Sequence, residues 1–170
     1  MERKARPFGP AFALGIALIA IVAVGSACAP ATSSPASTIR MLMPVEGIRV
    51  ADVVSNFGAV RGSRMHEGVD ILAPRGTPVF SAGHGIVHFL GATKQGGWTV
   101  WIRDGNHDVW YTHLDAIAAE LYPGSRVTPQ TSIGWVGNSG NASGGPTHLH
   151  FELATSRGPI DPLPLLADRF

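Results

Sequence analysis

Two histidines stand two positions apart near the C-terminal end of the chain, at 148 and 150. Apolar residues at 149, 151 and 153 alternate with polar residues at 148, 150 and 152, which is the period of a strand with one buried face. A strand over 148–153 would turn His148 and His150 to one side, about 7 Å apart. One imidazole could then bind a metal ion while the other reaches a ligand of that ion. A solvated pair of surface histidines fits these residues equally well.

A second segment, His66–Asp70, also holds groups that bind metals or move protons. It superficially resembles the HExxH helix of one class of zinc proteases. We reject a helix, because Gly68 lies inside the segment, a strand-like apolar run follows it, and Pro74 comes soon after. In an unbent strand His66 and Asp70 would be about 13 Å apart, so we expect Gly68 to permit a bend that brings both to one ion. An ordinary surface loop is the alternative.

A third polar segment, Trp110–Leu114, contributes His113. The three segments can act together only if secondary structure brings them close.

Stretches rich in Val, Ile, Phe and Trp, separated by turn signals, predict strands. They cover residues 68–72, 78–81, 85–90, 98–103, 107–113, 132–136 and 148–153. Only residues 115–121 look helical. The sequence therefore predicts an all-β (mainly β) fold, an antiparallel β-sheet or sandwich with long loops and little helix.

The N-terminal residues have the pattern of a signal sequence. Basic residues lie among the first six, no charge follows from residue 8 to residue 28, and the only cysteine, Cys28, ends the apolar run. This placement resembles the lipobox of bacterial lipoproteins, although Gly25 stands where a branched apolar residue is usual. The resemblance implies a signal peptide over 1–27 and a lipidated Cys28 that anchors the protein in a membrane. An uncleaved anchor over 11–29, or cleavage after Ala29, are the alternatives.

The residues after Cys28 have too little apolar surface to order themselves. Residues 29–38 are only Ala, Pro, Thr and Ser and carry no charge. We therefore assign residues 28–43 to the lipidated cysteine and a flexible tether. The 170 residues leave room for one folded domain, which we place at 44–165. Each interpretation of the N-terminus puts this domain outside the cytoplasm, in the cell envelope, and on the periplasmic side in a Gram-negative source.

The charge balance excludes one class of partner. Of 13 basic and 12 acidic residues, three basic and one acidic lie in the first six positions, so the remainder carries a formal charge of −1. Because phosphate binding depends on clustered Lys and Arg, we expect no nucleic-acid partner.

From about residue 44 to residue 162 the sequence closely resembles the lysostaphin-like zinc endopeptidases, the family that includes the LytM autolysin. The motifs that carry the resemblance are Ser55–Gly58, His66–Leu72, Pro74–Val79, Tyr111–Leu114, the glycines at 134 and 137, and Gly144–Glu152. Family membership implies the lysostaphin-like peptidase fold and a Zn²⁺ ion bound by His66, Asp70 and His150. It also implies that His113 and His148 are the catalytic pair and that the substrates are peptides of peptidoglycan.

Three protein ligands would leave one open position on a tetrahedral zinc ion, as expected of a catalytic site. Glu152 is predicted to face the same side as the histidines, where it either orients one of them or is an exposed strand carboxylate. The resemblance thus implies a zinc-dependent peptidoglycan endopeptidase. The alternative is a catalytically weak domain of the same family that binds cell wall or activates other cell-wall hydrolases.

Overall fold

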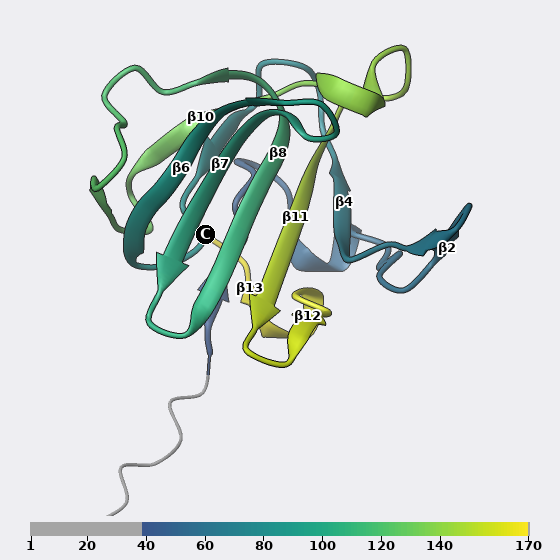
Figure 1. Ribbon diagram of the computed structural model, residues 1–170, viewed down its shortest axis with the longest axis horizontal. Helices are drawn as coiled ribbons and strands as arrows, with labels where there is room; N and C mark the ends of the chain where they lie inside the picture. Colours follow the sequence, from purple (N-terminus) through teal and green to yellow (C-terminus); the bar gives the residue numbers. More distant parts are fainter. Residues whose placement is uncertain (1–38, 170) are drawn as a thin grey trace, which may run out of the picture. The chain divides into compact units, whose positions relative to one another are not determined.

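The computed structural model describes residues 39–169 (Figure 1). The predicted signal peptide, the Cys28 anchor and most of the tether lie outside these residues. The described strands are β1 (Met41–Leu42), β2 (Val60–Arg61), β3 (Arg64–Met65), β4 (Gly68–Leu72), β5 (Pro78–Phe80), β6 (Gly85–Thr93), β7 (Gly97–Asp104), β8 (His107–Ile117), β9 (Arg126–Val127), β10 (Ser132–Val136), β11 (His148–Thr155), β12 (Gly158–Ile160) and β13 (Leu166–Ala167). Three 3₁₀ turns accompany them, η1 (Val50–Asp52), η2 (Gly140–Ala142) and η3 (Leu163–Leu165). No helix in the described part of the chain has the length and apolarity needed to span a bilayer.

Nine strands form one sheet, in which β12, β11, β8, β7, β6 and β9 are successive neighbours. β4 pairs with β11, and β10 pairs with both β5 and β8. All of these pairs are antiparallel, and the short β1 and β13 form a separate parallel pair. Figure 1 shows β6, β7, β8 and β11 side by side, with β4 beyond β11. The predicted antiparallel all-β fold is confirmed.

β8 is the strand that organises the sheet around the polar residues. Along one edge it pairs with β7. Along the other edge it pairs with β11 over residues 108–112 and with β10 over residues 114–117. The partner changes at His113, which has φ of 61° and is the only non-glycine residue with positive φ in the described chain. The sheet therefore divides at His113 into a β11 branch and a β10 branch.

The predicted helix over 115–121 is wrong. Residues 115–117 continue β8, where Ile117 lies opposite Gly134 and Ala116 opposite Trp135 of β10. The N–H of Ala118 then donates to the carbonyl of Ile133 at 3.0 Å. Pairing with β10 satisfies the backbone of this segment, so long-range contacts outweigh its weak helical preference.

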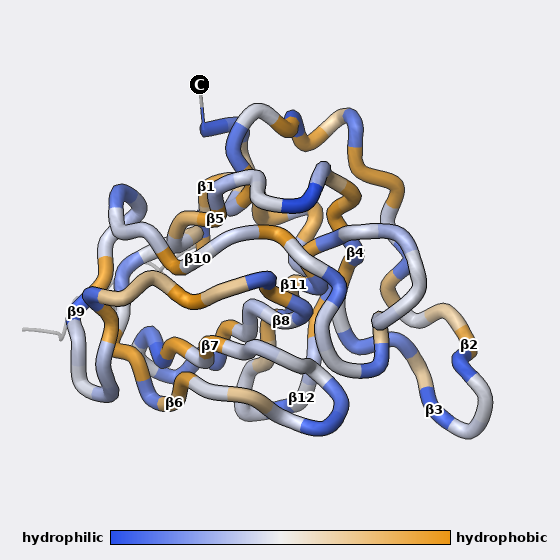
Figure 2. The backbone as a smooth tube through the Cα atoms, turned by 90° about the horizontal axis from the view of Figure 1, so that it is seen from above, coloured by the Kyte–Doolittle hydropathy of each residue, from blue (hydrophilic) through white to orange (hydrophobic). Residues whose placement is uncertain are grey.

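The core lies on one face of the sheet. In β11 the apolar positions 149, 151 and 153 are fully buried, and they pack with Tyr111 of β8 and Val69 and Ile71 of β4. Met41 and Met43 are buried in the same core, and β1 pairs with β13. The fold therefore extends beyond both ends of the predicted domain 44–165, because the pairing that orders these ends joins residues far apart in the sequence. Hydrophobic segments gather between β1, β5 and β10 in the view of Figure 2.

Candidate metal centre

The open face of the sheet carries the polar residues of β11. His148, His150 and Glu152 are half-buried on this face, opposite the buried Leu149 and Phe151. β4 pairs with β11 in a register that sets His150 directly across from Asp70. The two-residue alternation predicted for 148–153 is therefore confirmed, and pairing with β4 brings in the second polar segment.

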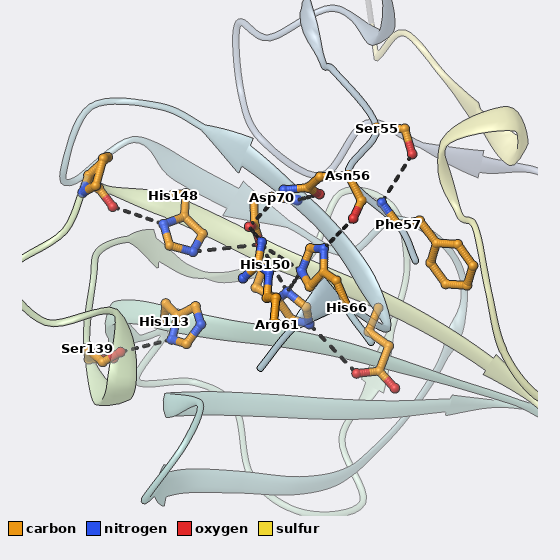
Figure 3. Close-up of polar contacts among 12 residues, drawn as sticks. Ser55, Asn56, Phe57, Arg61, His66, Asp70, His113, Ser139, His148 and His150 are labelled. Carbon is orange, nitrogen blue, oxygen red and sulfur yellow. Dashed lines mark hydrogen bonds and ion pairs between the residues drawn. The ribbon is translucent and has the colours of Figure 1, made fainter. Parts of the chain in front are cut away.

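Three side-chain atoms from these segments converge on one point (Figure 3). His66 Nε2 lies 2.8 Å from His150 Nδ1 and 3.1 Å from Asp70 Oδ1, and His150 Nδ1 lies 3.0 Å from Asp70 Oδ1. Two ligands about 2 Å from a tetrahedral zinc ion would stand roughly 3.3 Å apart. Two imidazole nitrogens and one carboxylate oxygen are also the donors that zinc prefers. The residues thus fit a zinc ion, and within the described chain they form the one group of this kind.

Gly68 does not have the role predicted for it. Its φ is not positive, so it makes no bend that only glycine could adopt. Instead, a side chain at this position would overlap the carbonyl of Phe151 and come within 3.0 Å of the His150 ring. Its lack of a Cβ therefore leaves room for His150 between β4 and β11. His66 reaches the site because it precedes β4, which begins only at Gly68, and so is not held to the strand geometry.

Backbone carbonyls fix the orientation of three histidine rings. The Nδ1 atoms of His66, His113 and His148 each lie 2.9 Å from a carbonyl oxygen, belonging to Asn56, Ser139 and Pro146 respectively. A carbonyl only accepts, so Nδ1 carries the proton in each ring and Nε2 keeps its lone pair. His150 is turned the other way, with Nδ1 in the cluster and Nε2 3.7 Å from Glu152 Oε2. Glu152 thus lies where it can orient His150.

His113 and His148 stand beside the three convergent residues. Their ring centroids are 5.0 Å apart, and the His113 ring is 5.9 Å from that of His150. The N–H of His113 donates to the carbonyl of Gly96 at 2.7 Å, which helps to hold its left-handed backbone conformation. The structure therefore brings together all five residues predicted for the site, from β4, β8, β11 and the segment before β4.

Burial and neighbouring charges set the protonation of the cluster. Burial lowers the pKa of His113 to about 4 and lowers that of His66. Desolvation opposes ionisation of Asp70, but hydrogen bonds with His150 and Arg61 outweigh it and lower the Asp70 pKa. Desolvation likewise opposes protonation of His150, yet Asp70 and Glu152 raise its pKa. Near neutral pH His66 and His113 are therefore neutral and Asp70 is ionised.

A pocket of about 150 Å³ opens beside the cluster. Hairpin β2–β3 supplies Arg61 and Arg64 to its lining, β8 supplies Trp110, and the η2 turn supplies Asn141. Trp110 stacks on Trp101 of β7 with ring centroids 4.5 Å apart, which fixes this wall of the pocket. The pocket opens onto the face that carries His66, His113 and His150.

Sequence reasoning did not identify Arg61 or the roles of Asn56 and Ser139. Arg61 Nη2 donates to Asp70 Oδ2 at 2.5 Å, and the Ser139 carbonyl orients His113. Ser139 Oγ also accepts from the N–H of Trp98 at 2.9 Å and donates to the carbonyl of Leu114 at 2.7 Å. None of these residues lies on a strand with a regular polar period, so only their contacts reveal them.

Known proteins are similar to this chain in sequence and fold. The sequence profile of peptidase family M23 matches residues 64–162. The L-Ala--D-Glu endopeptidase of Bacillus subtilis is 38% identical over 125 residues, which are 66% of this chain and 38% of that protein. The murein hydrolase activator NlpD of Escherichia coli is 30% identical over 140 residues, 81% of this chain and 34% of that protein. The chain thus spans well under two thirds of the length of these relatives.

A solved structure covers the domain itself. The catalytic domain of lysostaphin from Staphylococcus simulans is 26% identical and superposes with a TM-score of 0.59, covering 68% of this chain and 92% of that chain. The profile match takes in more than half of the chain and all five predicted site residues. The chain therefore belongs to peptidase family M23, the family of the lysostaphin-type peptidases.

Proposed function

We propose that the protein is a zinc-dependent endopeptidase that hydrolyses peptide bonds of peptidoglycan in the cell envelope. The observation that carries the proposal is the convergence of His66 Nε2, Asp70 Oδ1 and His150 Nδ1 beside two further histidines whose Nδ1 atoms lie against backbone carbonyls. The similarity to an L-Ala--D-Glu endopeptidase and to the catalytic domain of lysostaphin supports the substrate class.

In this mechanism His66, Asp70 and His150 would hold the ion. The chemistry supplied there would be that of a Lewis acid, with polarisation of the substrate carbonyl and a lowered pKa of the attacking water. His148 Nε2 lies 3.7 Å from Asp70 Oδ1, and the His113 ring lies beside the His148 ring. One of these two histidines would accept the proton of the attacking water at Nε2 and, now protonated, would return the same proton to the leaving amine. Because the Nδ1–H of each ring is bound to a carbonyl, proton exchange is confined to Nε2. Hydrogen bonds from a protonated ring also stabilise the developing oxyanion.

We further propose that the protein acts outside the cytoplasm as a membrane-anchored lipoprotein, with Cys28 as the lipidated residue. The uncharged apolar run that ends at Cys28 supports this placement. Mass determination of the mature N-terminus, with and without lipoprotein processing, would distinguish lipidation from an uncleaved anchor or a secreted form. An unmodified cysteine in the mature protein would contradict the proposed anchor.

A second candidate function is activation of other cell-wall hydrolases, favoured by the similarity to a murein hydrolase activator. The five filled and clustered site positions support the peptidase instead, since an activator has no need of metal ligands beside two oriented histidines.

The test is release of soluble peptides from purified peptidoglycan by the full-length protein in detergent. We expect cleavage that a chelator abolishes, that added zinc restores, and that His150→Ala lacks. A folded, zinc-loaded protein that releases nothing by itself, yet stimulates a separate hydrolase, would establish the activator function.

A further inference from the structure

The two oxygens of the Asp70 carboxylate face different partners (Figure 3). Oδ1 points into the cluster, 3.1 Å from His66 Nε2 and 3.0 Å from His150 Nδ1. Oδ2 points away from it and accepts from Asn56 Nδ2 at 3.0 Å and from Arg61 Nη2 at 2.5 Å. The carboxylate is thus held so that only one oxygen is offered to an ion.

Asn56 contacts both Asp70 and His66. Its side-chain amide donates to Asp70 Oδ2, while its Oδ1 accepts from the backbone N–H of Asp70 at 3.1 Å. Its backbone carbonyl accepts from His66 Nδ1 at 2.9 Å. One residue therefore orients two of the three proposed ligands. Asparagine suits this position because its side chain donates and accepts at once, which neither alanine nor an ionised aspartate can do.

The segment around Asn56 is itself docked against the residues before β4. The N–H of Gly58 donates to the carbonyl of His66, and the N–H of His66 donates to the carbonyl of Ala59, both at 2.8 Å. Ser55 Oγ contacts Asp161 Oδ2 at 3.1 Å, which ties the segment to the far side of β12. Asn56 is thus presented to Asp70 by a backbone that has its own hydrogen bonds.

We propose that Asn56, assisted by Arg61, is a positioning residue that sets the ligand geometry of the metal centre. This inference rests on the zinc site of the proposed function. With Oδ2 held by two donors, Asp70 binds through Oδ1 alone, so three single-atom ligands leave the fourth position of a tetrahedral ion open. An Asp70 free to rotate would offer both oxygens, the mode suited to larger cations such as Ca²⁺.

The first test measures the zinc affinity of the purified full-length protein by competition with a coloured chelator. Loss of an outer hydrogen-bond partner typically weakens metal affinity by about 10–100-fold, and we expect this for Asn56→Ala. Asn56→Asp should weaken it at least as much, since it sets a second carboxylate beside Asp70. Val54→Ala, on the same segment, is the matched control because its side chain is 84% exposed, and it should leave the affinity unchanged.

A second pair of variants, both in hairpin β2–β3, tests the contact made by Asp70 Oδ2. Arg61→Ala removes a donor to Asp70 Oδ2, whereas Arg64, on the partner strand, donates to Gln95 Oε1 instead. We expect Arg61→Ala to weaken zinc binding and Arg64→Ala to match the wild type. The visible spectrum of the Co²⁺-loaded proteins should lose its tetrahedral character in Asn56→Ala, a change that a general loss of stability would not produce.

Zinc affinity of a folded Asn56→Ala within about twofold of the wild type would overturn the inference. If Asn56→Ala does not fold in the presence of a chelator, the arginine pair decides, and equal affinities of Arg61→Ala and Arg64→Ala would overturn it. A wild-type protein that binds zinc in this Asn56-dependent way but cuts no peptidoglycan would refute the proposed function and leave the positioning role standing.

Discussion

Ring orientation separates the four histidines of the site into two kinds. His66, His113 and His148 are bound to backbone carbonyls through Nδ1, whereas His150 offers Nδ1 to the cluster and Nε2 to Glu152. The proposed ligands His66 and His150 thus use different ring nitrogens. This difference follows from where each residue lies, because His150 is fixed in β11 and His66 stands before β4.

We expect His113→Ala and His148→Ala to retain zinc while losing turnover. Both residues lie outside the three convergent ligand atoms, and general acid or base groups contribute about 10²–10⁴-fold to a rate. Peptide release from peptidoglycan and zinc content measured on the same preparations check this. Loss of zinc from either variant would show that the residue is a ligand instead.

Tyr111 gives a pH dependence that belongs to the core rather than to the site. Burial raises its pKa to about 12, and its hydroxyl accepts from the N–H of Ala82 at 2.8 Å. Because the folded pKa lies above the unfolded value of about 10, the phenol stabilises the fold below pH 10 and this contribution is lost as the pH rises toward 12.

Tyr111→Phe should therefore unfold about 1–3 kcal/mol more easily at neutral pH, because the Ala82 N–H is left buried without a partner. Denaturant titrations should show that the difference in unfolding free energy between variant and wild type, the stability gap, narrows from about pH 10 to pH 12. A gap that stays constant over this range would contradict the assignment.

At the scale of elements, seven strands were predictable, whereas the loops and the short strands β1, β2, β3, β9, β12 and β13 were not. Strand β11 follows from a local alternation that repeats every two residues, and in β4 the buried Val69 and Ile71 alternate with Asp70 in the same way. Asn56 and Arg61 lie in segments with no such period, so their contacts with Asp70 could not be foreseen. Four of the five predicted site residues lie on strands, which explains why the site was more predictable than its surroundings.

The start of β7 packs closely against the η2 turn and the residue before it. Gly97 has φ of 60°, and a Cβ there would overlap Ser139 and Gly140, whereas Gly105 has φ of 56° with open space around it. Gly105→Ala should cost about 1–2 kcal/mol for the left-handed backbone alone. Gly97→Ala should cost more and should also slow peptide release, since Ser139 orients His113. Equal losses of stability with equal activity would contradict this coupling.

At the scale of the molecule, Arg169 connects the end of the described chain to the first residues of the fold. Its Nε donates to the carbonyl of Met43 at 3.0 Å and its Nη2 to that of Ser81 at 2.9 Å, and its guanidinium lies 5.0 Å from the Phe80 ring. Both the predicted domain and the family match end before this residue. Contacts between residues 88 and 126 positions apart leave no local pattern, so the sequence could not reveal them.

Arg169→Ala should lower the free energy of unfolding by about 1.5–3 kcal/mol, the range for hydrogen bonds of a charged group. Arg157→Ala is the matched control, because Arg157 is exposed and only its backbone N–H makes a hydrogen bond. Thermal unfolding of both variants checks this. Equal melting temperatures would show that the C-terminal residues contribute little.

The two pairing edges of β8 also determine which parts of the molecule exchange amide hydrogens with solvent. Strand β8 is paired on both sides, so its amides should exchange only on global unfolding. Hairpin β2–β3 is a separate sheet of two strands with two residues each, so its amides should exchange faster. In Figures 1 and 2 this hairpin extends away from the main sheet. One wall of the pocket should therefore exchange its amide hydrogens faster than the strands that hold His113 and His150.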